Sequence, residues 1–188
     1  MSFLSFLLPA LLLGRFSPAS APIQTTPPKP AVIAWSAQRK LTWADFKSKP
    51  TPADRLAALT SGNIDVQVGC KDFVFSSQVQ AVFMPAESWV REATTASPDL
   101  LRHEQLHFDI TELYARRMRQ KLSQTQFDCQ HLQPKFQNLT KAVFAEWQHE
   151  EARYDQATNH GLNKQQQQLW ETQVQQKLAQ LEQFALAQ

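Results

Sequence analysis

The pentapeptide His103-Glu104-Gln105-Leu106-His107 is the part of this sequence best suited to chemistry. Two histidines four positions apart lie one turn from each other on the same face of a helix, so both imidazoles can bind one metal ion. Glu104 lies beside them, and its carboxylate can take a proton from a water molecule on that ion. The same pattern also arises by chance, and the histidines then have only packing or surface roles. We expect one zinc ion here, with His103 and His107 as ligands and Glu104 as the general base.

A catalytic zinc ion takes three protein ligands and keeps a fourth position open, so one more ligand must come from elsewhere in the chain. The candidates are His131, His149, Glu150, Glu151, Asp155 and His160, of which His131 and His149 are expected to lie on the surface. Glu151 follows Trp147 by four positions and Asp155 comes one turn later, so both carboxylates can face inward from a helix. Asp155 could equally accept the N–H of a ligand imidazole. His160 stands next to Gly161, where the helix is expected to break and the backbone is free to present the side chain.

The second half of the chain, which carries these residues, has a helical period. From Ser97 onward, apolar residues recur every three or four positions, which is typical of amphipathic helices. The predicted helices span 98–122, 132–157 and 163–187. Ser97 is expected to cap the first of them, with Pro98 at its first position. The pentapeptide lies on this helix, whereas the run Gln165–Gln168 on the third is interpreted as solvated surface.

The stretch before Ser97 has the two-residue period of β-strands. Ile64, Val66 and Val68 alternate with polar or small residues, and a similar alternation continues through residues 73–83. This pattern predicts two or three short antiparallel strands, and a further strand is expected within Ala31–Phe46. The predicted fold class is therefore α+β, in which a small antiparallel sheet is followed by three long helices.

Composition excludes several other kinds of site. The 188 residues include 19 Lys and Arg against 17 Asp and Glu, without a basic block, so nucleic acid is not expected as a partner. The four glycines stand far apart, which excludes a glycine-rich phosphate loop. Two cysteines are too few for a four-cysteine zinc site.

The N-terminus predicts export. Met1–Leu13 is an apolar run too short to span a bilayer, and small residues follow it, as in a secretory signal peptide. The alternative is an uncleaved hydrophobic anchor. We expect a signal peptide at 1–21 with cleavage after Ala19 or nearby, a proline-rich linker at 22–31 and the folded domain at 32–188. The mature protein is then secreted or periplasmic, without a stable membrane anchor.

Cys70 and Cys129 are the two cysteines of the chain. In an exported protein they are expected to form one disulfide, which ties the sheet to the loop between the first two helices. The alternative is a pair of free thiols.

The chain also resembles a bacterial family described as secreted zinc-dependent proteases and catalogued as a domain of unknown function. The resemblance covers nearly all of residues 35–175. It rests on these segments: Trp35–Ser36, Leu41–Phe46, Ala57–Thr60, Ser88–Val90, Leu101–Ile110, Tyr154–Asp155, Thr158, His160–Gly161, Gln168 and Trp170.

The resemblance implies a zinc metallopeptidase of zincin-like fold and favours the segment from Tyr154 to Gly161 as the second half of the site. We therefore expect His160 as the third ligand, with Asp155 as the runner-up and Glu151 as a further alternative. In this interpretation Tyr154 donates a hydrogen bond to the oxyanion of the reaction. By analogy with other peptidases that carry the pentapeptide, the strand at Gln78–Phe83 is expected to pair with an extended peptide.

The expected substrate is a peptide, a protein or a cell-wall peptide, cleaved with Glu104 as general base. Two alternatives stay open at this point. One is a non-catalytic envelope binding protein with a structural metal ion, and the other is an amidase that acts on cell-wall peptides. Glu104 separates the first alternative from an enzyme, because a structural site has no use for a carboxylate beside its ligands.

Overall fold

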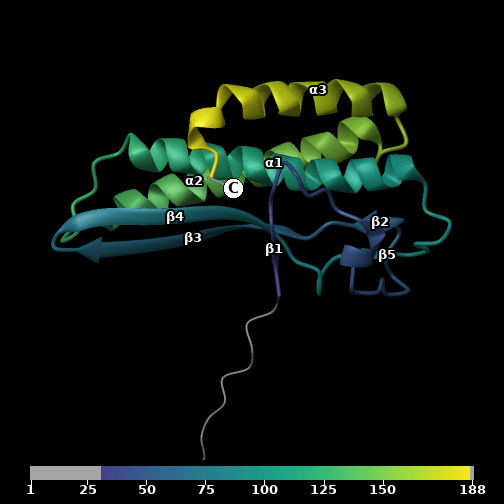
Figure 1. Ribbon diagram of the computed structural model, residues 1–188, viewed down its shortest axis with the longest axis horizontal. Coiled ribbons are helices and arrows are strands. Elements are labelled where there is room, and N and C mark those ends of the chain that lie inside the picture. The colour runs from purple at the N-terminus through teal and green to yellow at the C-terminus, as the bar shows by residue number, and fades with distance from the viewer. Residues whose placement is uncertain (1–30, 187–188) are drawn as a thin grey trace, which may run out of the picture.

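The computed structural model describes residues 31–186. The predicted signal peptide and all but the last residue of the predicted linker lie outside the described residues. The remainder is an α+β fold with two small antiparallel sheets and three long helices, which confirms the predicted class (Figure 1). The helices are α1 (Pro98–Ser123), α2 (Lys135–Thr158) and α3 (Lys164–Gln180).

The main sheet is built on one long hairpin. Its strands, β3 (Gly62–Lys71) and β4 (Val74–Phe83), pair over their full length and are joined by Asp72 and Phe73. The short β1 (Ile33–Ala34) pairs with the end of β4, so the strand order is β1-β4-β3. Two long strands thus replace the short ones that the sequence predicted, because the serines within β4 lie opposite other strand residues and do not interrupt the ladder.

A second sheet of two short strands lies beside the start of α1. It pairs β2 (Ala58–Leu59) with β5 (Trp89–Val90) in antiparallel fashion. β2 leads directly into β3, so the two sheets are consecutive along the chain.

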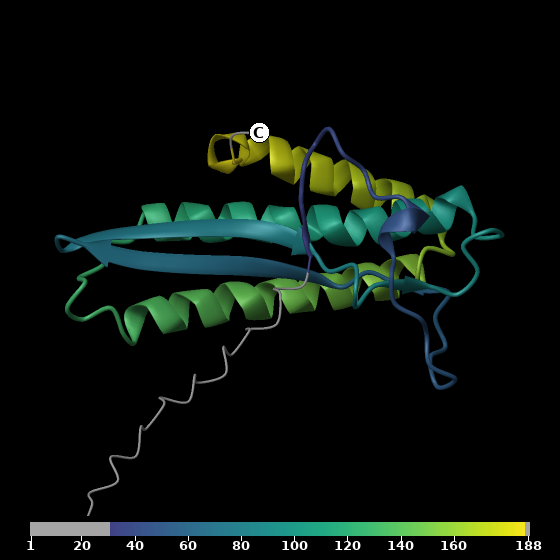
Figure 2. The ribbon, with the colours of Figure 1, turned by 60° about the horizontal axis from the view of Figure 1, so that its bottom comes forward.

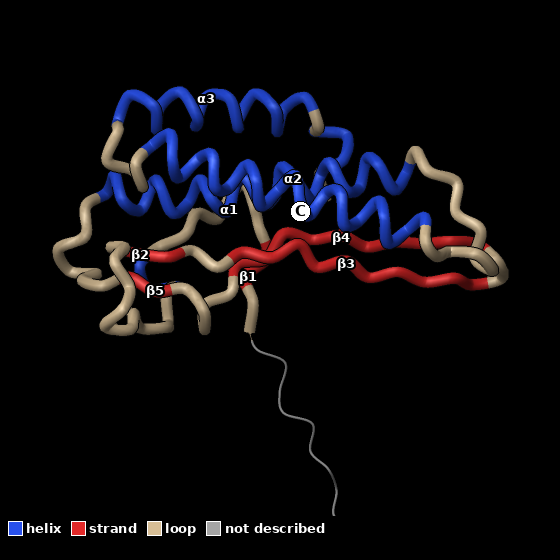
Figure 3. The backbone as a smooth tube through the Cα atoms, turned by 180° about the vertical axis from the view of Figure 1, so that it is seen from behind, coloured by secondary structure: helices blue, strands red, loops and turns tan. Residues whose placement is uncertain are grey.

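The helices form two layers over one face of the hairpin (Figures 1 and 3). α1 packs on the sheet, α2 lies beside α1, and α3 packs on both helices from the far side. α1 therefore has neighbours on most sides, and its residues Ile110, Leu113, Ala115 and Met118 are completely buried. The helix that carries the pentapeptide is the centre of the core, so the backbone of the site belongs to a closely packed element.

Local signals place the helix ends close to the prediction. The Ser97 hydroxyl accepts a hydrogen bond from the Leu100 N–H and Pro98 begins α1, as the sequence indicated. α3 ends earlier than predicted, near Leu181, and a 3-10 turn follows. The buried guanidinium of Arg116 donates to the Leu178 carbonyl there, and Arg119 binds the Phe184 carbonyl, so the chain turns back toward α1.

The predicted disulfide between Cys70 and Cys129 is present. It joins the far end of the hairpin to the loop between α1 and α2, which lie close together in Figure 2. Among residues 31–186, no helix has the length and apolar character needed to cross a membrane.

Candidate metal centre

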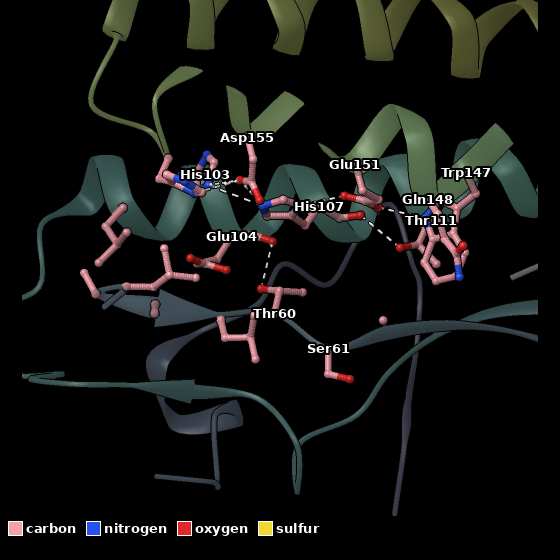
Figure 4. A pocket seen from close by; sticks show the side chains of 17 residues that line it. Thr60, Ser61, His103, Glu104, His107, Thr111, Trp147, Gln148, Glu151 and Asp155 are labelled. Atoms are coloured by element: carbon pink, nitrogen blue, oxygen red, sulfur yellow. Dashed lines mark hydrogen bonds and ion pairs between the residues drawn. The ribbon is translucent and has the colours of Figure 1, made fainter. Parts of the chain in front are cut away.

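Three side-chain atoms, two from α1 and one from α2, point toward one another (Figure 4). Nε2 of His103 and Nε2 of His107 lie 3.3 Å apart on α1. Oδ1 of Asp155, from α2, lies 3.2 Å from the first nitrogen and 3.1 Å from the second. These three residues form a group that could hold a metal ion.

The dimensions of this triangle fit one small tetrahedral ion. With zinc-to-ligand bonds of roughly 2.0–2.1 Å, two ligand atoms of a tetrahedron are about 3.3 Å apart. The three observed separations lie between 3.1 and 3.3 Å. Two imidazole nitrogens and one carboxylate oxygen are also a donor set that zinc prefers.

His107 is oriented by a second carboxylate. Its Nδ1 lies 2.5 Å from Oε2 of Glu151, and the other oxygen of Glu151 accepts a hydrogen bond from the Trp147 indole at 2.7 Å. Burial alone lowers the pKa of His107, but Glu151 and Asp155 outweigh burial and hold that pKa well above its ordinary value. Glu151 therefore binds Nδ1 of His107, the nitrogen that faces away from the candidate metal site. The sequence did not indicate that the Trp147 indole would bind Glu151.

The pKa of Asp155 is shifted in the opposite direction from that of His107. Burial alone raises its pKa, but the contacts with His103 and His107 lower that pKa below its ordinary value. Its carboxylate is therefore ionised, as a metal ligand has to be.

His103 is oriented from α3. Its Nδ1 faces Oε1 of Gln167 at 3.3 Å, and Gln167 is only 4% exposed. The expectation that the glutamine run is solvated surface is thus wrong for this residue. Gln167 recurs at helical spacing with Trp170 and Val174 on the buried face of α3, and this periodicity was the available signal.

Tyr154 does not have the position that its predicted role requires. It is completely buried, and its hydroxyl lies 2.7 Å from Oε1 of Gln167 and 3.2 Å from the His103 carbonyl. Burial raises its pKa, so the hydroxyl stays a donor to these oxygens. Its ring stacks on His103, which makes Tyr154 a support of the ligand and not a donor into the pocket.

His160 lies at the rim, half exposed, with Nδ1 3.4 Å from Oδ1 of Asp155. It follows Asn159 in a left-handed stretch that ends at Gly161. A Cβ at Gly161 would lie 2.9 Å from Cβ of His103, so only glycine lets the chain pass this ligand. The structure therefore brings Asp155 into the group with both histidines and leaves His160 beside it.

A cavity of about 400 Å³ lies between α1, α2 and the strand β2, and its lining includes His103, His107, Glu151, Asp155 and His160. Glu104 is 3% exposed and points from α1 into it (Figure 4). Within residues 31–186 its carboxylate has no hydrogen-bond partner, although its backbone carbonyl accepts the Thr60 hydroxyl at 3.2 Å. An unpaired carboxylate beside two imidazoles is free to exchange a proton with a ligand in the cavity.

The strand that borders this cavity is not the one that the sequence indicated. Along Gln78–Phe83, β4 pairs with β3 on one side, while β1, the Trp35 N–H and the Arg119 side chain bind the other side. The expected pairing of this strand with a peptide is thus wrong, because the edge is already occupied. Residues 56–62, which include β2, line the cavity instead.

One comparison with known proteins gives a match. Residues 78–161 match the profile of a family described as "Bacterial protein of unknown function (DUF922)". The segment runs from β4 to Gly161 and includes the pentapeptide, Asp155 and His160, but covers less than half of the chain. Neither the curated proteins nor the solved structures contain a match.

Proposed function

We propose that this chain is a zinc-dependent metallopeptidase that hydrolyses peptide bonds outside the cytoplasm. The observation that carries the proposal is the arrangement of four side chains in one cavity. His103, His107 and Asp155 present three atoms at the spacing of a tetrahedral zinc site, and the unpaired Glu104 carboxylate lines the same cavity.

The donor set fits zinc with Asp155 as third ligand in place of His160. A zinc ion held there would polarise a carbonyl group and make water a stronger nucleophile at neutral pH. Glu104 accepts the proton of the attacking water and passes it to the leaving amine. Glu151 and Gln167 keep both imidazoles turned so that Nε2 faces the cavity.

The backbone of β2 supports an extended peptide as substrate. The Arg91 N–H donates to the Ala57 carbonyl, so in the antiparallel ladder the neighbouring Ala58 points its own N–H and C=O away from β5. Thr60 follows by the same alternation, and both residues line the cavity. A peptide strand that pairs with this edge passes beside Glu104.

The charge of the cavity disfavours the C-terminal end of a peptide as the site of cleavage. Glu104, Glu151 and Asp155 contribute carboxylates, whereas none of its lining residues within 31–186 is Lys or Arg. The cavity therefore has no side-chain cation that would bind the carboxylate at the C-terminus of a substrate.

Export is supported by the disulfide, because such bonds persist in oxidising compartments such as the periplasm. The apolar segment at the N-terminus points the same way.

The test is a comparison of the parent chain with Glu104→Gln. We expect one zinc per chain in both by elemental analysis, and a loss of about 10²–10⁴-fold in hydrolysis of quenched fluorescent peptides for Glu104→Gln, since the amide cannot take a proton. The matched control is His149→Gln on exposed α2 surface, which should leave zinc and activity unchanged. Equal activity in the parent and Glu104→Gln contradicts the proposal.

The same assay separates the alternatives. Activity on cell-wall peptides and none on the fluorescent library identifies an amidase that uses the same water-activating groups. Stoichiometric zinc without hydrolysis of either substrate class identifies a binding protein with a structural metal ion.

A further inference from the structure

The side-chain amide of Gln167 contacts His103 in the candidate metal centre, although the sequence around Gln167 indicated solvated surface. It comes from α3, which is 64 residues away from His103 along the chain, and it is buried beneath that ligand. Its carbonyl oxygen lies between the Tyr154 hydroxyl and Nδ1 of His103. Its NH2 group donates to Oε1 of Glu171 at 3.0 Å.

Glu171 determines which way this amide points. A carboxylate only accepts hydrogen bonds, so the NH2 group of Gln167 has to face it, and the carbonyl oxygen has to face His103. The other oxygen of Glu171 lies 2.6 Å from the guanidinium of Arg102. The chain of contacts therefore runs from Arg102 through Glu171 and Gln167 to His103.

The direction of the amide determines in turn where His103 carries its proton. A carbonyl oxygen only accepts, so Nδ1 of His103 has to donate to it. The lone pair of the neutral imidazole is then on Nε2, the atom that lies with His107 and Asp155. Without this acceptor, the proton is free to occupy Nε2 and to block a metal ion.

We propose that Gln167, oriented by Glu171, is a positioning residue that holds His103 in its metal-binding tautomer, and that α3 is thereby a functional part of the metal centre. The inference rests on the proposed zinc site. It assigns to α3 the role for His103 that Glu151 and Trp147 on α2 have for His107.

The experiment measures zinc affinity by competition with a chelator, and the absorption spectrum of the cobalt(II) form, for purified full chains. Gln167→Leu keeps the volume and removes the acceptor, so we expect zinc affinity to fall about 10–100-fold and the cobalt bands to shift. The double variant Gln167→Glu with Glu171→Gln keeps an acceptor toward Nδ1 and a donor for the other oxygen at position 167, and it should restore affinity to within about threefold of the parent. Gln168→Leu, on the exposed side of the same helix, is the control and should match the parent.

Glu171→Lys tests the direction of the amide and not merely its presence. Because a lysine only donates, it should draw the Gln167 oxygen away from His103 and lower zinc affinity at least about tenfold with Gln167 still in place. Glu171 is partly exposed, so this variant also serves if Gln167→Leu does not fold.

Parental zinc affinity and cobalt spectra in both Gln167→Leu and Glu171→Lys overturn the inference while leaving the proposed function intact. A parent chain that binds no zinc overturns the proposed function and this inference together.

Discussion

At the scale of residues, the geometry changes the order of the candidate ligands. The sequence favoured His160 because imidazole is a common partner beside two histidines and Gly161 frees the backbone. In the fold, the carboxylate of Asp155 reaches both imidazoles from α2, whereas the ring of half-exposed His160 lies 3.4 Å from that carboxylate. The choice depends on how α2 crosses α1, which no local pattern encodes.

The two assignments predict different phenotypes. Asp155→Asn should lower zinc affinity more than about 100-fold, because a neutral amide is a poor zinc ligand. His160→Ala should lower zinc affinity less than about 100-fold. Chelator competition and elemental analysis measure both. Loss of zinc in His160→Ala with retention in Asp155→Asn would restore the order that the sequence suggested.

The raised pKa of His107 predicts a pH dependence of the metal-free chain. The proton on His107 stabilises the fold fully below the ordinary pKa of 6.5, and this contribution is lost as pH rises through the raised value. The lowered pKa of Asp155 adds stability above 3.8, which is lost as pH falls through the lowered value.

The metal-free parent should therefore exceed His107→Gln in stability most between about pH 4 and pH 6.5, and the difference should shrink at higher pH. Urea unfolding with chelator present measures it. A difference that stays constant from pH 5 to pH 9 contradicts the assigned partners of His107.

At the scale of elements, the end of α2 is shaped around His103, a candidate ligand on α1. Asn159, His160 and Gly161 all have positive φ, and Gly161 passes within contact of His103. This turn also sets the direction of α3 and thus the place of Gln167. One glycine therefore joins the packing of two helices to the geometry of the site.

Gly161→Ala should lower both stability and metal binding. The positive φ costs about 1–2 kcal/mol for alanine, and the added Cβ pushes His103 from its position, which should weaken zinc binding at least about tenfold. Thermal unfolding and chelator competition measure the two effects. Gly69→Ala is the control, since it meets only the end of the Ser76 side chain; equal behaviour of both variants would contradict this account.

At the scale of the whole molecule, α1 is held in place from several sides. Buried Glu112 binds both Arg116 and Arg119, which also bind the C-terminal segment. The segment that contains Trp35 is fastened next to these contacts, where its indole donates to buried Asp109 and its ring lies against Arg116. The disulfide closes the end of the molecule that is remote from the cavity.

Removal of the disulfide should affect stability and not chemistry. The double variant Cys70→Ser with Cys129→Ser loses a link between residues 59 apart, which should cost about 2–4 kcal/mol in the free energy of unfolding. Zinc content at low temperature should stay at the parental value, because neither cysteine lines the cavity. Denaturant unfolding measures the loss, and unchanged stability would show that the bond is unimportant for the fold.

The sequence by itself determined what depends on neighbouring residues and on composition. The capping residues and the helical period placed α1 and α2 within a few residues of their observed ends. The spacing of His103 and His107 put both on one helical face, and a single pair of cysteines allowed only one disulfide. Tertiary structure alone decided the contacts between elements: Asp155 lies against both imidazoles, Gln167 lies beneath His103, Tyr154 is turned away from the cavity, and β2 borders the cavity. These depend on how α2 and α3 cross α1, and helix crossings are set by the packing of many side chains together, so no short stretch of sequence specifies them.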